Sequence, residues 1–228
     1  MDSVIKTYII NTRQYEDEAA FNTAVEFVSP YRRQKIALLK NMKDKMRSLA
    51  AAIALNTALK EYGLEERTME YDVGKQGKPY FRYNPDIHFS LSHSGDYAIC
   101  SIGSHETGND IELIKSGRER VAKRFFATEE LDWIYETQDP RERDNRIFRI
   151  WTMKESFLKV TGRGMSLPLK NFAVMLSDDG GVSIRQNFND ITYHMKEYAI
   201  PEPLPEYDAY KVAVCSESET FAPELVVV

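Results

Sequence analysis

Apolar residues in the first half of the chain switch between the spacing of a helix and that of a strand. The segment 44–62 is rich in alanine and leucine and ends at Gly63, a residue that commonly terminates helices. Two apolar stretches flank Ser94-Gly95-Asp96, which is typical of a hairpin. We expect a strand at Tyr8–Asn11, helices at Glu18–Phe27, Pro30–Leu39 and Asp44–Tyr62, and strands near Glu70–Tyr71, Ile87–Ser92 and Tyr97–Ile102.

The second half shows helical spacing first and strand spacing afterwards. Thr128 precedes two glutamates and a leucine, a combination that favours a helix start. We expect helices at Arg120–Phe126, Thr128–Glu136 and Arg141–Val160, then strands near Phe172–Leu176, Gly181–Arg185, Thr192–Tyr198 and Tyr210–Cys215. The order of helices and strands predicts an α+β protein.

The two halves also resemble each other. Each has a long helix, a basic glycine loop and antiparallel strands, with the loops at Gly77-Lys78 and Gly162-Arg163-Gly164. The final strands, 97–100 and 212–215, are similar as well. Taken alone, this similarity is weak evidence for a repeat.

Composition agrees with a folded protein that crosses no membrane. The chain has 228 residues, of which 43% are hydrophobic and 29% are charged, and no apolar run approaches the 18 or so residues of a membrane span. The N-terminus lacks the apolar core of a signal peptide. Cys100 and Cys215 lie in apolar stretches, so we expect reduced, buried thiols in a cytoplasmic protein, with neither a membrane nor a nucleic acid as partner.

Charge is distributed unevenly along the chain. Residues 32–47 carry a net charge of +6, whereas the rest of the chain carries −11. A basic segment in an acidic protein suits an anion-binding site. The alternative is a solvated helix face, and we expect Lys40, Lys43 and Lys45 to belong to one.

Two acidic segments carry the candidate chemistry. In a strand, Asp110 and Glu112 project to one face while Ile111 turns toward a core. In a helix, Glu155 and Lys159 share a face. Three carboxylates with adjacent ammonium groups suit a magnesium ion that holds a pyrophosphate. Alternatively, Glu155 and Lys159 form an ordinary surface pair, worth about 0.2–0.5 kcal/mol.

Four motifs in order then make a specific resemblance. They are Gly77-Lys78-Pro79, Ser92-His93-Ser94, Gly108-Asn109-Asp110-Ile111-Glu112 and Trp151-Thr152-Met153-Lys154-Glu155-Ser156-Phe157-Leu158-Lys159. The chain resembles the 4′-phosphopantetheinyl transferases, in particular the larger monomeric type that serves peptide and polyketide synthases. Further similar stretches extend the resemblance over nearly the whole chain.

The resemblance implies both a fold and a reaction. The fold would be α+β, with two pseudo-symmetric halves, each a small antiparallel sheet packed with a long helix. We place these halves at 1–106 and 107–228, with the active site between them. The reaction would transfer the phosphopantetheine arm of coenzyme A to a serine of an acyl or peptidyl carrier protein and release adenosine 3′,5′-bisphosphate.

Roles are carried over residue by residue. The resemblance implies that Asp110, Glu112 and Glu155 bind Mg²⁺, with Mn²⁺ as the alternative. Glu155, directly or through a water molecule, would be the general base. Lys159 would place positive charge near the phosphoryl group. Lys154 would either hold phosphate or position the helix.

Further residues match family positions associated with coenzyme A: Arg32, Lys35, Arg47, Ser48, Lys78, Ser92 and His93. Their cations and hydroxyls suit phosphate groups. For His93, a structural hydrogen-bonding role is the alternative. Two residues depart from the family pattern. Asn109 stands where an apolar residue is usual, and Arg32 stands where lysine is frequent.

The carrier protein needs a docking surface. Arg118, Arg120, Lys123 and Arg124 form a basic cluster that suits an acidic partner. The alternative is an ordinary amphipathic helix, and we expect Phe125 and Phe126 to lie in the core. We expect a monomer, because one chain holds both halves. Two rival functions remain: a non-catalytic binding module for coenzyme A or carrier protein, and a magnesium-dependent pyrophosphohydrolase.

Overall fold

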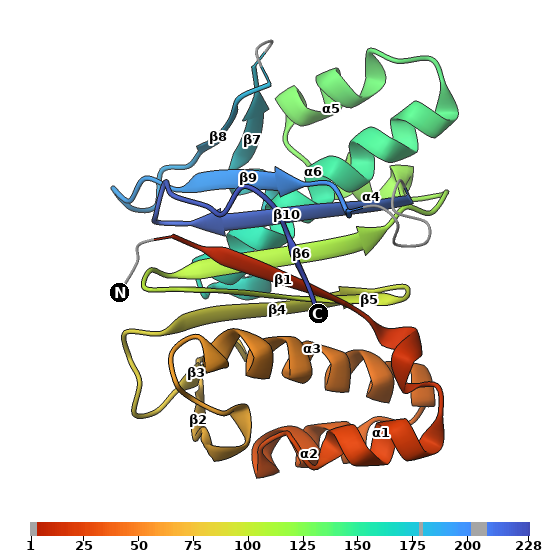
Figure 1. Ribbon diagram of the computed structural model, residues 1–228. Coiled ribbons are helices and arrows are strands. Elements are labelled where there is room, and N and C mark those ends of the chain that lie inside the picture. Colours follow the sequence, from red (N-terminus) through yellow and green to blue (C-terminus); the bar gives the residue numbers. More distant parts are fainter. Residues whose placement is uncertain (1–3, 178–179, 202–208) are drawn as a thin grey trace.

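Two largely antiparallel sheets form the centre of the molecule, with helices on both sides (Figure 1). The computed structural model describes residues 4–177, 180–201 and 209–228. The first sheet has the order β11-β1-β5-β4, from Val226–Val227, Lys6–Asn11, Tyr97–Gly103 and His88–Ser94. The second has the order β6-β10-β9, from Thr107–Leu113, Tyr210–Ser216 and His194–Tyr198. Two small hairpins pair β2 (Tyr71–Val73) with β3 (Pro79–Phe81), and β7 (Ala173–Leu176) with β8 (Val182–Arg185).

The helices fall into two groups. In Figure 1, α1 (Glu18–Val25), α2 (Pro30–Leu38) and α3 (Met42–Lys60) lie together below the sheets. The second group follows β6 in the chain: α4 (Glu119–Phe125), α5 (Thr128–Tyr135) and α6 (Pro140–Val160). The α+β prediction is therefore confirmed. None of the described helices combines the length and the apolar run that crossing a bilayer requires.

Helix α3 packs one face on the first sheet. Its N-cap is Asn41, whose side chain accepts a hydrogen bond from the backbone N–H of Asp44 at 2.8 Å. Its alanines and leucines are buried against β4 and β5. Beyond the helix, Gly63 adopts a φ of +70° and its N–H bonds to the carbonyl of Lys60. The prediction placed the start two residues late, because the helix is capped by Asn41 and begins at Met42.

Helix α6 packs on the second sheet through an unusually close approach. Asp139 caps its first turn, and Pro140 occupies the first helical position. A Cβ atom added to Gly108 of β6 would lie 2.1 Å from the carbonyl oxygen of Ser156. Glycine at this position therefore lets the helix backbone lie directly against the strand, beside the acidic pair of β6, Asp110 and Glu112.

The halves share one core. Ile9 and Ile99 of the first sheet pack in the same apolar cluster as Ile111 and Val214 of the second. In addition, β11 from the end of the chain pairs in parallel with β1. Strand β11 belongs to the second half by sequence but to the sheet of the first half by pairing. The boundary between 1–106 and 107–228 stays a prediction.

Two strands escape the sequence analysis. Strand β3 begins with Pro79, a residue that disfavours strands, and β11 is only two residues long. Neither offers enough alternation to be recognised. By contrast, both cysteines are free and buried, as expected, and burial raises the pKa of each thiol.

Candidate active site between the two halves

A cavity of about 500 Å³ brings the predicted residues of both halves together. We call it the central cavity. From the first half, Arg32, Lys35, Ser48, Lys78, Ser92 and His93 line it, and from α6, Glu155 and Lys159 line it. Because α6 contributes residues four apart, the predicted shared helix face is confirmed. Arg47, Asp110, Glu112 and Lys154 do not line this cavity, and their places are described below.

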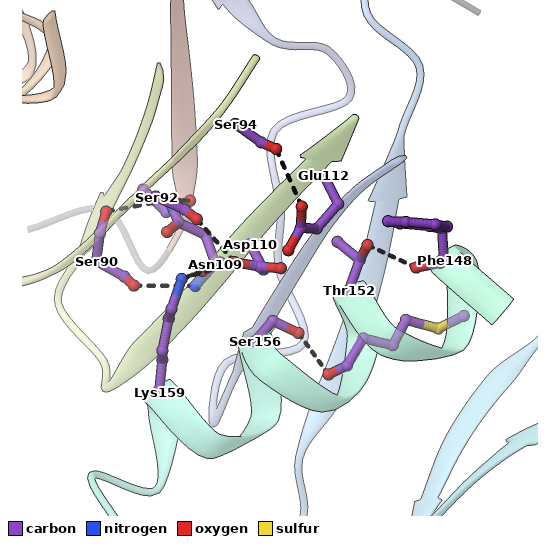
Figure 2. A network of polar contacts seen from close by, with 12 residues as sticks. Ser90, Ser92, Ser94, Asn109, Asp110, Glu112, Phe148, Thr152, Ser156 and Lys159 are labelled. Atoms are coloured by element: carbon purple, nitrogen blue, oxygen red, sulfur yellow. Dashed lines mark hydrogen bonds and ion pairs between the residues drawn. The ribbon is translucent and has the colours of Figure 1, made fainter. Parts of the chain in front are cut away.

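Serines of β4 connect the edges of the two sheets at the acidic pair. Strands β4 and β6 belong to different sheets, yet Figure 2 shows their side chains joined by hydrogen bonds. The hydroxyl of Ser92 donates to Oδ1 of Asp110 at 2.7 Å. The hydroxyl of Ser94 donates to Oε2 of Glu112 at 3.0 Å and accepts from the N–H of Leu113. The first half therefore orients both carboxylates of the second.

Asn109 of β6 forms further hydrogen bonds to the first sheet, on the buried side of the strand (Figure 2). Its N–H donates to the hydroxyl of Ser90, and its side-chain amide donates to the Ser90 carbonyl and the Ser101 hydroxyl, each at 3.0 Å. The amide is fully buried. A local hydrogen-bond network thus accommodates the departure from an apolar residue. Ile111 points into the core, which confirms the predicted alternation.

Lys159 ties α6 to the acidic pair. Its ammonium donates to Oδ1 of Asp110 and to the backbone carbonyl of Asn109, each at 2.8 Å (Figure 2). Asp110 is 5% exposed, so this ion pair is poorly screened by solvent. The close approach at Gly108 makes this short reach possible.

The charges of Asp110 and Glu112 affect the pKa of the third carboxylate, Glu155. Burial, followed by the charge of Asp110, raises the pKa of Glu155 to about 6 despite the opposing charge of Lys159. Glu112 contributes to the same increase. Burial and the charge of Asp110 also raise the pKa of Glu112. The three carboxylates that the sequence analysis grouped, Asp110, Glu112 and Glu155, are therefore close enough to interact electrostatically.

This acidic group fits a divalent cation in chemistry, although it is not assembled into a coordination shell. Within the described ranges, no three His, Cys, Asp or Glu side chains already stand in position to hold a metal ion. However, Oδ2 of Asp110 is buried without a hydrogen-bond partner there. A buried carboxylate oxygen of this kind normally has a partner. A hard cation would satisfy it and relieve the repulsion by Asp110, which raises the pKa of both glutamates in addition to the larger effect of burial.

Lys78 is held by a glutamate that the sequence analysis missed. Its ammonium donates to Oε2 of Glu106 at 2.7 Å and to the carbonyl of Thr107 at 2.8 Å. Nδ1 of His88 lies 3.1 Å from Oε1 of Glu106. Although burial opposes it, the hydrogen bond with His88 and the charge of Lys78 lower the pKa of Glu106 to about 2. No motif or spacing marks Glu106, because its role depends on the turn that joins the halves.

The charge of Arg47 acts on His93, but of these two residues only His93 lines the cavity. Desolvation of the ring, and then the charges of Lys159 and Arg47, lower the pKa of His93. The Arg47 side chain donates to the carbonyl of Gly95 at 2.8 Å and pairs with Asp44 at 3.0 Å. The coenzyme-binding prediction for Arg47 is therefore not supported by the cavity, and its charge acts on His93.

Lys154 requires a correction. Its side chain is fully buried and pairs with Glu130 of α5 at 2.6 Å. It also donates to the carbonyl of Phe172 at 2.9 Å. The residue therefore contacts no part of the central cavity, and the direct phosphate-holding role is wrong. The other interpretation, a lysine that positions the helix, agrees with this pair, which links α5, α6 and the start of β7.

The basic cluster lies on and beside α4. Arg120, Lys123 and Arg124 are exposed. Phe126 is 1% exposed and belongs to the core with α6, as expected, while Phe125 packs against that core only partly. The exposed charges therefore remain available to a partner.

Comparisons with known proteins agree with this geometry. A family model described as the 4′-phosphopantetheinyl transferase superfamily matches residues 106–215. A 4′-phosphopantetheinyl transferase from Bacillus subtilis is 36% identical over 195 residues, covering 85% of this chain and 84% of that protein. The 4′-phosphopantetheinyl transferase Sfp from Bacillus subtilis strain 168 is 34% identical over 90% of this chain and 88% of its own length.

Similarity extends to more distant proteins. The human L-aminoadipate-semialdehyde dehydrogenase-phosphopantetheinyl transferase is 24% identical over 68% of this chain and 54% of its own length. A solved holo-[acyl-carrier-protein] synthase from Thermotoga maritima matches 49% of this chain and 61% of its own, with 18% identity and a TM-score of 0.40. Because the two Bacillus subtilis proteins are at least 34% identical to this chain over 85–90% of its length, the chain belongs to the 4′-phosphopantetheinyl transferase family.

Proposed function

We propose that coenzyme A occupies the central cavity and that its phosphopantetheine arm is transferred from there to a serine of an acyl or peptidyl carrier protein. One observation carries this proposal. Cationic and hydroxyl side chains of the first half share a single cavity with Glu155 and Lys159 of α6, in a chain whose family is defined by this transfer. A site of this kind between subdomains suits a large phosphorylated substrate.

Asp110, Glu112 and Glu155 would hold Mg²⁺, with Mn²⁺ as the alternative. The partnerless oxygen of Asp110 and the raised pKa values of the two glutamates support this assignment. When bound, the cation would offset negative charge on the pyrophosphate and on the departing phosphate. Ser92 and Ser94 would fix two of the three ligands, and Ser92, which also lines the cavity, would contact the nucleotide there.

The side chains of α6 would carry the proton and the charge. The serine oxygen of the carrier forms a bond to the phosphorus that bears the pantetheine arm, while the bond from that phosphorus to the oxygen of the departing adenosine bisphosphate breaks. Glu155, with a pKa of about 6, is ionised near neutral pH and suited to accept the serine proton. Lys159 would stabilise the charge that develops on the phosphoryl group.

The nucleotide end would lie against the first half. Arg32 and Lys35 would hold the 3′-phosphate, whose charge is about −1.5 to −2 by analogy with other phosphate monoesters. Ser48, Lys78 and His93 would contact the rest of the nucleotide. Because His93 has a lowered pKa, it would act as a neutral hydrogen-bond donor at pH 7 until the phosphate arrives. Since one chain lines the whole cavity, we propose that a monomer is active.

Mass spectrometry tests this function directly. The protein is incubated with Mg²⁺, coenzyme A and an apo carrier protein, and the carrier is then weighed. A mass gain equal to the phosphopantetheine arm is the expected result. No gain across several carriers would favour the non-catalytic binding module. Release of adenosine bisphosphate without any carrier would instead indicate a pyrophosphohydrolase.

A further inference from the structure

Arg32 lines the central cavity with a buried guanidinium group that has unpaired hydrogen-bond donors in the described part of the chain. Its side chain is only 8% exposed, yet Nε and Nη2 have no hydrogen-bond partner among the described residues. Burying such donors without acceptors is costly, and more so when they belong to a charged group. Because Arg32 lines the cavity, a ligand with acceptor oxygens can satisfy the guanidinium group there.

Charge holds Arg32 in this position. The side chain of Glu66 is completely buried, and its Oε1 lies 3.8 Å from Nε of Arg32. This distance is an ion-pair contact but is too long for a hydrogen bond. The carboxylate of Glu66 instead accepts hydrogen bonds from the N–H of Ser29 at 2.5 Å, the hydroxyl of Ser29 at 2.9 Å and the hydroxyl of Tyr71 at 2.5 Å.

Aromatic faces complete the support. The rings of Tyr31 and Tyr71 stack with centroids 4.7 Å apart. The guanidinium carbon of Arg32 lies 5.6 Å from the Tyr31 centroid and 5.2 Å from the Tyr71 centroid, within cation–π range. Charge and ring faces therefore hold the guanidinium group without a hydrogen bond from Nε or Nη2 to any described residue.

Glu66 also sets the helix that carries Arg32. Ser29 is the N-cap of α2, and its side chain accepts from the N–H of Arg32 at 3.3 Å. By binding both the N–H and the hydroxyl of Ser29, Glu66 anchors the first turn of α2. The backbone N–H of Glu66 is itself held by Asn56 of α3. The support therefore continues from α3 to the cavity wall.

We infer that Glu66 is a positioning residue for Arg32 and gives this chain an arginine-based receptor for the 3′-phosphate of coenzyme A. The inference rests on the proposed function. Arg32 belongs to the first half, whereas the acidic group that suits the cation and pyrophosphate lies on β6 and α6. Arg32 is thus left for the phosphate at the other end of the nucleotide. A forked guanidinium group must be oriented to bind a phosphate, which a lysine at this position does not require.

Selective kinetics test the inference. Glu66→Gln keeps the shape of the side chain but removes its charge and turns one oxygen into a donor. The variant is assayed with coenzyme A and with 3′-dephospho-coenzyme A. We expect KM for coenzyme A to rise about tenfold, with kcat and the KM for the dephospho form changing by less than about twofold. Glu65→Gln is the matched control, because Glu65 is half exposed and pairs with Arg67. It should behave as wild type.

Combination with Arg32→Ala separates positioning from general structure. If Glu66 acts through Arg32, Glu66→Gln has no further effect on the ratio of the two KM values in the Arg32→Ala background. An equal rise for both substrates, no rise, or a selective rise that persists without Arg32 would overturn the inference. If Arg32→Ala does not raise KM for coenzyme A more than KM for the dephospho form, the 3′-phosphate assignment fails too. Should Glu66→Gln not fold, Glu66→Asp carries the test, with a smaller selective rise expected.

Discussion

Removing the charge of Glu155 should stabilise the protein while it abolishes transfer. In the absence of a divalent cation, three carboxylates lie near one another, and the pKa of Glu155 is raised from 4.5 to about 6. At about 1.4 kcal/mol per pKa unit, this difference corresponds to about 2 kcal/mol. Glu155 is partly exposed, so solvent screening reduces the expected gain for Glu155→Gln to about 1 kcal/mol.

The pH dependence has a defined sign. The folded protein holds the Glu155 proton more tightly than the unfolded chain does, because the folded-state pKa is the higher one. The cost of ionised Glu155 is therefore full at pH 7–8 and disappears as the pH falls from about 6 toward 4.5. The stability difference between Glu155→Gln and wild type should vanish over the same window.

Thermal unfolding of the chelator-treated proteins measures this. At pH 7.5 the variant should unfold about 2–4 °C above wild type. Added Mg²⁺ should stabilise wild type and reverse the order. Glu224→Gln, at an exposed carboxylate, is the control and should leave stability unchanged. A variant no more stable than wild type, or a gain that is equal at pH 5 and pH 7.5, would refute the electrostatic reasoning.

Three further changes test other parts of the site. Lys154→Met should destabilise by about 3–5 kcal/mol in chemical denaturation by leaving Glu130 buried without its cation, while the transfer rate of the folded fraction stays near wild type; a lost rate with intact folding would restore a catalytic role. Gly108→Ala should displace α6, lower the free energy of unfolding by about 1–3 kcal/mol and lower kcat. Gly74→Ala is the control and should have none of these effects, because its Cβ would lie 3.4 Å from the carbonyl oxygen of Lys78, an ordinary contact distance. Charge reversal of Arg120 and Lys123 should raise KM for carrier protein but not for coenzyme A, and equal effects on both would refute carrier docking at α4.

Local patterns predicted most of the elements. The alternation at 110–112 and the four-residue spacing of Glu155 and Lys159 correctly gave the faces on which these side chains lie. Helix ends were predicted to within about two residues, because caps and glycines act locally. The family motifs supplied the pairing of distant segments, which periodicity alone does not contain.

Contacts between distant segments account for what the sequence did not reveal. Lys154 lies in the most specific motif, yet its ammonium pairs with Glu130, 24 residues away on α5. Glu106 and Glu66 carry no motif, and their roles arise only when Lys78 and Arg32 are folded against them. Arg47 does not line the central cavity although its neighbour Ser48 does, because adjacent residues in one helix point to different sides. Buried ion pairs of this kind depend on tertiary packing and leave little trace in local spacing.

Binding of Mn²⁺ in the presence of coenzyme A tests the central claim most directly. The claim is that Asp110, Glu112 and Glu155 hold one divalent cation beside the cavity. Because Mn²⁺ is paramagnetic, bound and free ion can be counted by electron paramagnetic resonance. We predict one site per wild-type chain, greatly weakened in each of the variants Asp110→Ala, Glu112→Ala and Glu155→Ala. Wild-type binding retained by all three variants would contradict the account.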